Sequence, residues 1–393
     1  MASTTYLVTV SGPDRVGVGA QLFAALATFA SDATSLRDVA QITLRGQLVL
    51  CAELATDEAL SASQVRQRVL DHGVATGGVT VVVEPVAVSE VAAGHRLLVT
   101  LLAPAIGAAA LEGVFSAIAA TGATCERIVH LATFPVDCYE LVVRGPDHDA
   151  LRRRVTAAAQ DLGLDLAVQR AGLHRRAKHL VVMDADSTLL RDEVIDLLAE
   201  VAGRADEVAA VTAATMAGEM DFAESLRRRV AVLAGLPATV LDDVRARLRL
   251  TPGARTLLRT LGRLGYVAAV VSGGFVEVLA PLLDELGVPY LEANRLEIVD
   301  GHLTGRVRDP IVDRAGKARA LRRFAEEVGV PLAQTVAVGD GANDIDMLSV
   351  AGLGIAFNAK AVVREHADAA LSVPYLDAVL YFLGISREEI ETD

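Results

Sequence analysis

Three short apolar runs in the C-terminal part of the chain each end in charged, hydroxyl or glycine residues. They are LVVMD at 180–184, VAAVVS at 267–272 and TVAVGD at 335–340. Helix-patterned segments separate them, and this alternation is typical of a parallel α/β sheet. Open α/β sheets bind ligands outside the carboxyl ends of their strands. The polar ends of the three runs therefore predict one shared site at one edge of a sheet.

Carboxylates follow two of these runs. Asp184 and Asp186 end the first run, and Asp340 and Asp344 follow the third. Clustered carboxylates are hard oxygen ligands that suit Mg²⁺, which commonly joins protein carboxylates to a substrate phosphate. The predicted cofactor is therefore Mg²⁺.

The second run and the segment after it supply groups that suit a phosphate. The run ends in Ser272, Gly273 and Gly274, which offer one hydroxyl and two backbone amides without side-chain obstruction. Lys317 lies between the second and third runs and can supply a point positive charge. A phosphate site is therefore predicted in an otherwise acidic chain.

Taken in order, DADST, SGG, Lys317 and GDGANDIDM match the four motifs of the haloacid dehalogenase phosphohydrolases. A single Asp is often only a helix cap or turn residue, but that does not explain an ordered set over 184–347. The chain resembles this superfamily, which implies a three-layer Rossmann-like α/β core. The stretch at about 191–251 is helix-patterned without a convincing strand, and we expect it to be an inserted helical cap.

The resemblance implies a mechanism. Asp184 would attack phosphorus in line and form an aspartyl phosphate. Asp186 would protonate the leaving oxygen and then take a proton from the hydrolytic water. Ser272 and Lys317 would hold the phosphoryl oxygens and complete the catalytic set.

The same resemblance implies the metal ligands. Asp184, the backbone carbonyl of Asp186 and Asp340 would bind Mg²⁺ directly. Asp344 would support the metal through its waters or orient Lys317.

The helical cap carries the evidence on substrate. A zwitterionic amino acid needs an anion for its ammonium and preferably an Arg for its carboxylate. Glu193, nine residues after Asp184, and Arg229 in FAESLRRRV match the residues that phosphoserine phosphatases use for these tasks. Arg227 and Arg228 compete with Arg229 for this role.

Longer phrases carry the same resemblance, namely DEVIDLLAE at 192–200, TMAGEMDFAESLRRRV at 215–230 and SGGF at 272–275. Their pattern implies further pocket residues, with the alternative that Met216 and Phe222 only pack the cap. We prefer helix capping for the Thr188 hydroxyl. The implied substrate-binding residues are Glu193, Arg229, Ser272, Gly273, Gly274, Lys317, Asn343, Met216 and Phe222, with Phe275 closing the pocket.

The expected function is Mg²⁺-dependent hydrolysis of O-phospho-L-serine to L-serine and phosphate, the final step of serine biosynthesis by this resemblance. One alternative is a phosphatase of other small phosphates or phosphorylated proteins. A second alternative is an amino-acid sensor, but a sensor does not need the full catalytic set.

The N-terminal third contains a weak internal repeat, in which 6–29 resembles 97–121. Each copy follows the order βαββ, and a helix at 61–71 and a strand at 79–84 complete βαββαβ in the first copy. The two copies resemble ferredoxin-like ACT domains, which bind amino acids. The resemblance implies effector binding, serine for example, near Gly17 and Gly107, although both glycines could simply shape a turn. It also implies a homodimer.

We expect three domains, an ACT domain at 1–86, a second at 95–172 and the phosphatase domain at 178–393. The basic segment HRRAKH at 174–179 is interpreted as a solvated linker.

Composition excludes several classes of partner. A formal charge of −13 disfavours nucleic acid and anionic lipid, and the absence of Trp disfavours base-stacking platforms. Three cysteines without a CxxC pair do not indicate a disulfide framework, and no signal peptide is recognisable. We therefore expect a cytoplasmic protein.

Overall fold

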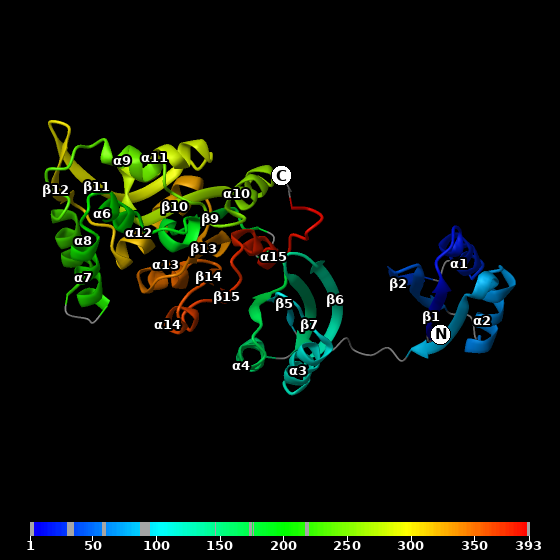
Figure 1. The fold of residues 1–393 in the computed structure, drawn as a ribbon. Helices are drawn as coiled ribbons and strands as arrows, with labels where there is room; N and C mark the ends of the chain where they lie inside the picture. Colours follow the sequence, from blue (N-terminus) through cyan, green and yellow to red (C-terminus); the bar gives the residue numbers. More distant parts are fainter. Residues whose placement is uncertain are drawn as a thin grey trace. The chain divides into compact units, whose positions relative to one another are not determined.

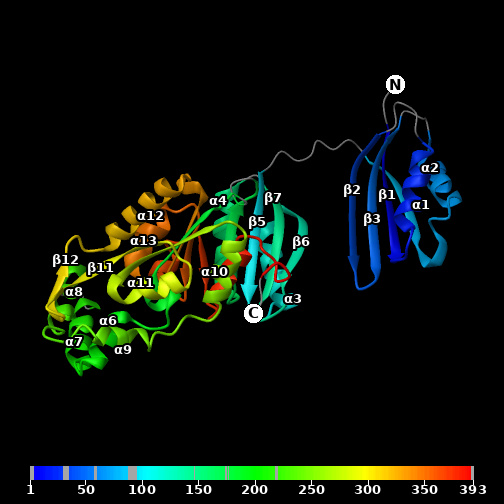
Figure 2. The ribbon, with the colours of Figure 1, turned by 90° about the horizontal axis from the view of Figure 1, so that it is seen from above.

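A computed structural model describes residues 4–29, 35–56, 60–86, 95–145, 147–172, 175, 177–216 and 220–390. The chain forms two compact units, residues 1–93 and 94–393, which are considered separately (Figures 1 and 2). The second predicted ACT domain and the predicted phosphatase domain thus belong to one compact unit.

The first unit has the predicted βαββαβ order. Its four antiparallel strands lie in the order β2-β3-β1-β4. Apolar residues alternate along β1, where Tyr6, Val8 and Val10 are buried beneath the two helices. The elements are β1 Thr4–Pro13, α1 Val18–Ala27, β2 Ser35–Leu44, β3 Gln47–Thr56, α2 Ala62–Asp71, the short turn η1 Thr76–Gly78 and β4 Thr80–Val86.

The second unit begins with another βαββαβ module. Its helices cover one face of the strands, with Leu97, Val99 and Leu101 buried beneath them. The elements are β5 His95–Ala103, α3 Ala108–Ala119, β6 Thr124–Ala132, β7 Asp137–Gly145, α4 His148–Asp161 and β8 Asp165–Arg170. The four strands join a larger sheet through one antiparallel pairing of β8 with β15, at Ala167 and Ala369.

The rest of that sheet forms the core of the predicted phosphatase domain. Its strand order is β12-β11-β10-β9-β13-β14-β15, and all neighbours are parallel except the β11–β12 hairpin. The strands are β9 Leu180–Met183, β10 Val267–Phe275, β11 Tyr290–Val299, β12 His302–Arg308, β13 Thr335–Gly339, β14 Gly354–Phe357 and β15 Ala369–Leu371. The three predicted strands occupy the centre, as β10, β9 and β13.

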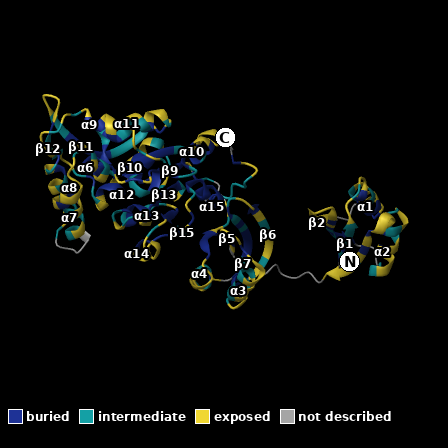
Figure 3. Cartoon of the chain, in the orientation of Figure 1, coloured by how far each residue is buried: buried dark blue, intermediate teal, exposed yellow. Residues whose placement is uncertain are grey.

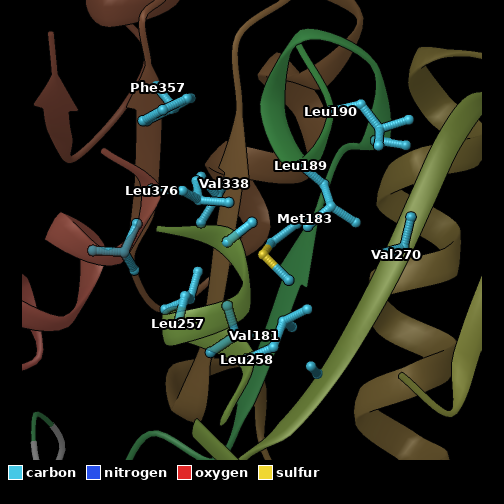
Figure 4. Packing of buried hydrophobic residues seen from close by; sticks show 14 of the residues in the cluster. Val181, Met183, Leu189, Leu190, Leu257, Leu258, Val270, Val338, Phe357 and Leu376 are labelled. Carbon is cyan, nitrogen blue, oxygen red and sulfur yellow. The ribbon is translucent and has the colours of Figure 1, made fainter. Parts of the chain in front are cut away.

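Helices cover both faces of the core sheet, which confirms the three-layer prediction. Val181 and Met183 pack with α10 and α11 on one face, whereas Leu180 and Val182 pack with α12 and α13 on the other (Figure 4 shows the first face). Each fully buried side chain of this kind stabilises the fold by roughly 1.5–3 kcal/mol. The helices are α10 Ala254–Arg263, α11 Val276–Glu285, α12 Arg314–Val328, α13 Ile345–Val350, α14 Ala361–Arg364 and α15 Val379–Phe382, with short turns η3 Leu332–Gln334, η4 Ala342–Asp344 and η5 Leu376–Ala378.

In the described part of the chain, four helices form the cap after β9. They are α6 Val194–Val201, α7 Ala205–Met216, α8 Phe222–Ala231 and α9 Val240–Arg245. The segments that enter and leave the cap pair with each other, through an antiparallel bridge between Leu190 and Leu250 and a hydrogen bond from Thr251 N to Leu189 O.

The β11–β12 hairpin also reaches the cap, which the sequence did not lead us to expect. Leu303 N donates to Leu236 O and Leu303 O accepts from Gly235 N. Gly305 approaches the end of α8 so closely that an added β-carbon would lie 3.2 Å from Ala231 O and 2.8 Å from the β-carbon of Ala234, just after the helix. The cap is therefore packed by a hairpin contributed from a distant part of the chain.

The basic segment at 174–179 does not behave as predicted. Arg175 and Lys178 are buried, with 7% and 4% of their surfaces exposed. In contrast to exposed helix faces, the central core strands β9, β10 and β13 are largely buried (Figure 3). Arg175 pairs with Glu140, and Lys178 donates to Ala333 O at 2.6 Å. His174 and Arg176 lie outside the described residues. The interpretation as a solvated linker is wrong for Arg175 and Lys178, because both side chains are buried and each donates to an acceptor within the protein. No helix among the described residues has the length and apolarity to span a membrane.

Candidate active site

Lys317 lies between two carboxylates at the carboxyl edge of the core sheet. Its Nζ donates to Asp184 Oδ2 at 2.6 Å and to Asp344 Oδ1 at 2.7 Å. Asp184 is held where β9 ends, because its N–H donates to Val338 O and its Oδ1 accepts from Ala185 N at 2.7 Å. Lys317 is fully buried, so this cation is fixed beside Asp184.

Asp186 lies on the loop that follows, and both of its carboxylate oxygens are engaged. Its Oδ1 accepts from Val194 N at 3.0 Å, and its Oδ2 lies 3.4 Å from Ser272 Oγ. Ser272 Oγ in turn accepts from Gly274 N at 2.8 Å. Ser187 makes the turn with a φ of 56°, a left-handed conformation that is uncommon outside glycine. This turn brings Asp186 toward the glycine loop of β10.

Asp340 and Thr188 contact each other across the site. Thr188 Oγ1 donates to Asp340 Oδ1 at 2.9 Å. The preference for helix capping by Thr188 is therefore wrong, because the loop turns its hydroxyl toward β13. The N-cap residue of α6 is instead Glu193, and its side chain makes no capping hydrogen bond.

The electrostatics of the cluster leave negative charge in excess. Burial raises the pKa of Asp184, and Asp344 adds to this while Lys317 opposes it. Burial and then Asp344 raise the pKa of Asp340 to about 6. Burial lowers the pKa of Lys317, but its two carboxylate partners outweigh this and raise it. One lysine does not neutralise the three carboxylates.

A divalent cation fits this cluster. Asp184, Asp340 and Asp344 each present a carboxylate oxygen, and the three oxygens lie within 4.8 Å of one another. An oxygen-only donor set suits Mg²⁺.

Two residues of the cap region, Glu193 and Phe222, lie close to the segments that surround this cluster. Glu193 Oε1 accepts from Ser187 Oγ at 2.8 Å. Phe222 at the start of α8 lies so close to Gly273 that an added β-carbon would be 3.2 Å from its Cζ. A β-carbon added to Gly274 would likewise lie 3.1 Å from Asp186 Oδ2. Both glycines thus leave room that a side chain would fill.

Arg229 of α8 has an unsatisfied donor. Its buried Nε has no hydrogen-bond partner among the described residues. Burial lowers the pKa of Arg229, while Asp196, Glu193 and Asp186 oppose the shift. Arg227 instead pairs with Asp309, and Arg228 with Glu224, both near the surface. Arg227 and Arg228 are thus engaged in ion pairs near the surface, whereas the Arg229 Nε is buried without a partner among the described residues.

The remaining predicted residues differ in what the structure says of them. Phe275 is fully buried, and Asn343 is half-buried beside Gly341. Met216 ends α7, but its side chain lies outside the described residues. Gly17 has a φ of 95° at the start of α1, whereas Gly107 before α3 has an ordinary negative φ. Among the described residues, neither glycine has a neighbour that an added β-carbon would meet.

Asn294 is a residue that the sequence analysis missed. It is buried on β11, where its Nδ2 donates to Gly273 O and its Oδ1 accepts from Val312 N, both at 2.8 Å. It therefore holds the glycine loop of β10 to the loop before α12. Its only sequence signal is a polar residue inside a strand-like run, YLEANRLEIV.

We expect Asn294→Ala to lower the kcat of the reaction at this site by about 10- to 100-fold. The reason is that loss of Asn294 would let the glycine segment of β10 shift, and small displacements of positioning groups have effects of this size. Stability should fall by about 1–3 kcal/mol, since two buried backbone groups lose their partners. Asn294→Asp keeps the acceptor for Val312 but loses the donor to Gly273. Steady-state kinetics and denaturant unfolding measure both effects, and an unchanged kcat in both variants would exclude this positioning role.

Family models match three parts of the chain. Residues 181–349 match haloacid dehalogenase-like hydrolases, and residues 4–83 and 94–169 each match an ACT domain. A phosphoserine phosphatase of Streptomyces coelicolor is 52% identical over 387 residues, which cover 98% of this chain and 94% of that protein. The chain belongs to the phosphoserine phosphatase family. Another family member, from Mycobacterium tuberculosis, is 48% identical and covers 99% of this chain and 95% of its own length.

Solved structures of phosphoserine phosphatases agree with this family. A probable phosphoserine phosphatase from Vibrio cholerae has a TM-score of 0.58 at 32% identity, covering 74% of this chain and 88% of that one. A substrate-bound phosphoserine phosphatase complex has a TM-score of 0.50 at 41% identity, covering 52% of this chain and 98% of that one. The core fold and the family are thus shown both by sequence and by structure.

Proposed function

We propose that this enzyme hydrolyses O-phospho-L-serine to L-serine and phosphate in a Mg²⁺-dependent reaction, as the last step of serine biosynthesis. The observation that carries the proposal is the pairing of buried Asp184 with Lys317 beneath a cap that presents Glu193 and Arg229. Family members carry the name of this activity, which supports the substrate.

In the proposed reaction, an Asp184 oxygen attacks phosphorus as the bond from phosphorus to the seryl oxygen breaks. Lys317 and Ser272 hold the phosphoryl oxygens, together with the Gly273 and Gly274 amides. Asn343 borders the phosphate region. The resulting aspartyl phosphate is then hydrolysed, which regenerates the Asp184 carboxylate.

Asp186 is proposed to move the protons. Burial and then Glu193 raise the pKa of Asp186 to about 7, so both protonation states are populated near neutral pH. The acid form protonates the leaving seryl oxygen, and the carboxylate then accepts a proton from the attacking water. One group can thus serve both half-reactions.

Asp184, Asp340 and the backbone carbonyl of Asp186 would hold Mg²⁺, with Asp344 in its outer shell. When bound, Mg²⁺ supplies positive charge that reduces the repulsion between nucleophile and phosphate. The excess of carboxylates over Lys317 supports this choice of ligands.

The cap is proposed to select the amino acid. Arg229 would bind the substrate carboxylate through its unpaired Nε, and Glu193 would bind the ammonium. Phe222 and Met216 would border the pocket from the cap.

The ACT domains would add regulation by an amino acid, serine for example, near Gly17 and Gly107 in a homodimer. A cytoplasmic location stays a prediction from composition.

The test is phosphate release from O-phospho-L-serine in the presence and absence of Mg²⁺. We expect EDTA to abolish activity and added Mg²⁺ to restore it, with phosphothreonine and p-nitrophenyl phosphate turned over more slowly. Equal or faster turnover of those other esters would favour the broader phosphatase, and activity that survives EDTA would contradict the metal assignment.

A further inference from the structure

The second ACT domain has a pocket on the sheet face opposite its helices. On this face, Leu102 and Cys138 pack into the core of the catalytic domain. Further along the same strands, Leu98 and Val142 instead form the floor of a pocket of about 600 Å³. This pocket is distinct from the active site and from the turns at Gly17 and Gly107.

The acidic groups of the pocket already have cationic partners. Glu126 accepts from Arg96 Nε at 2.6 Å and also from Arg144. Glu140, itself buried, pairs with Arg175. Neither glutamate therefore leaves an unopposed negative charge to attract a cation.

The basic groups of the pocket retain unused donors. Arg175 is more than nine-tenths buried, and its Nε has no hydrogen-bond partner among the described residues. Arg127 lines the same pocket, and its guanidinium makes no ion pair within the described part of the chain. A buried donor without a partner is unfavourable, because it loses its bonds to water. An anionic oxygen would satisfy it.

We propose that this pocket binds a small aliphatic carboxylate. The carboxylate would accept from Arg175 Nε and be attracted by Arg127, while a short apolar chain would contact Leu98 and Val142. The apolar floor favours an aliphatic carboxylate over inorganic phosphate, which has no apolar part. Both an amino acid and a simple carboxylic acid carry this chemistry.

The pocket lies next to the segment that connects the second ACT domain to the catalytic domain. Arg175 belongs to the segment between β8 and β9, and β9 leads directly to Asp184. The Arg175 guanidinium also packs against Gly384 after α15, where an added β-carbon would lie 2.6 Å from Nη1. A ligand on Arg175 would thus contact the connection between the two domains.

Calorimetric titration of the full chain tests the site, with EDTA present to remove metal from the active site. The probes are isobutyrate, L-valine and inorganic phosphate. We expect isobutyrate to bind, and Arg127→Ala and Arg175→Lys each to weaken its binding at least tenfold. Arg175→Lys keeps a cation beside Glu140 but lacks the Nε donor. The matched control is Arg247→Ala, an exposed arginine of the cap region, which should bind isobutyrate as the native chain does.

The outcomes distinguish the sources of the ligand. L-valine that binds as tightly as isobutyrate indicates an amino acid, and isobutyrate alone indicates a simple carboxylic acid. Both results support the site. Binding of phosphate without either carboxylate overturns the ligand class. Absent binding, or binding that Arg127→Ala leaves unchanged, overturns the site, and this variant decides the question even if Arg175→Lys fails to fold.

Discussion

Asp184→Asn is expected to lower kcat for phosphate release from O-phospho-L-serine by a factor on the order of 10⁴ or more, the scale of losing a catalytic nucleophile. The amide is nearly isosteric with the carboxylate but is a poor nucleophile and carries no charge to pair with Lys317. Steady-state kinetics at saturating Mg²⁺ measure the effect, and circular dichroism checks that the variant is folded.

The matched control for this substitution is Asp206→Asn. Asp206 is exposed in the first turn of α7, so the same chemical change there should leave kcat unaltered. Retention of native activity by Asp184→Asn would overturn the nucleophile assignment, whereas loss of activity in both variants would point to a general effect of lost charge.

Arg229→Ala is expected to lower kcat/KM for O-phospho-L-serine by about 100-fold, because truncating one partner of a buried charged pair costs about 2–5 kcal/mol. Turnover of p-nitrophenyl phosphate should be retained, since this ester has no carboxylate for Arg229 to bind. Parallel kinetics on the two substrates separate a specificity role from a role in the chemical step.

Arg228→Ala provides the comparison within the same triplet. Its guanidinium pairs with Glu224 one helical turn away and is largely exposed, and exposed pairs of this kind contribute little. We expect native kinetics on both esters. An equal loss in Arg228→Ala and Arg229→Ala, or an equal loss on both esters, would contradict the assignment of the carboxylate to Arg229.

Local patterns were sufficient for most of the core and for the reaction class. The apolar runs at 180–184, 267–272 and 335–340 predicted the three central strands, because buried parallel strands need continuous apolar residues. The polar residues after them predicted one site, because parallel strands all end at the same edge. The contacts of Lys317 with Asp184 and Asp344 follow that geometry.

Long-range packing decided what the local pattern left open. The β11–β12 hairpin reaches the cap through contacts between residues about seventy positions apart, such as Leu303 with Leu236. Thr188 bonds to Asp340 across the site rather than capping α6. Neither partner could be inferred from neighbours in the sequence, because both contacts depend on where separate strands end.

By itself, the sequence determined the α/β core, the two ACT modules and the family, since these depend on residue periodicity and on motifs within short segments. Only the tertiary structure decided which charges are buried. It removed Arg175 from solvent because the strand carrying Glu140 provides a partner, and it buried the Arg229 Nε of the cap helix α8 without a partner among the described residues. Burial and pairing are properties of distant segments brought together, and they determine where a charged group can bind a ligand.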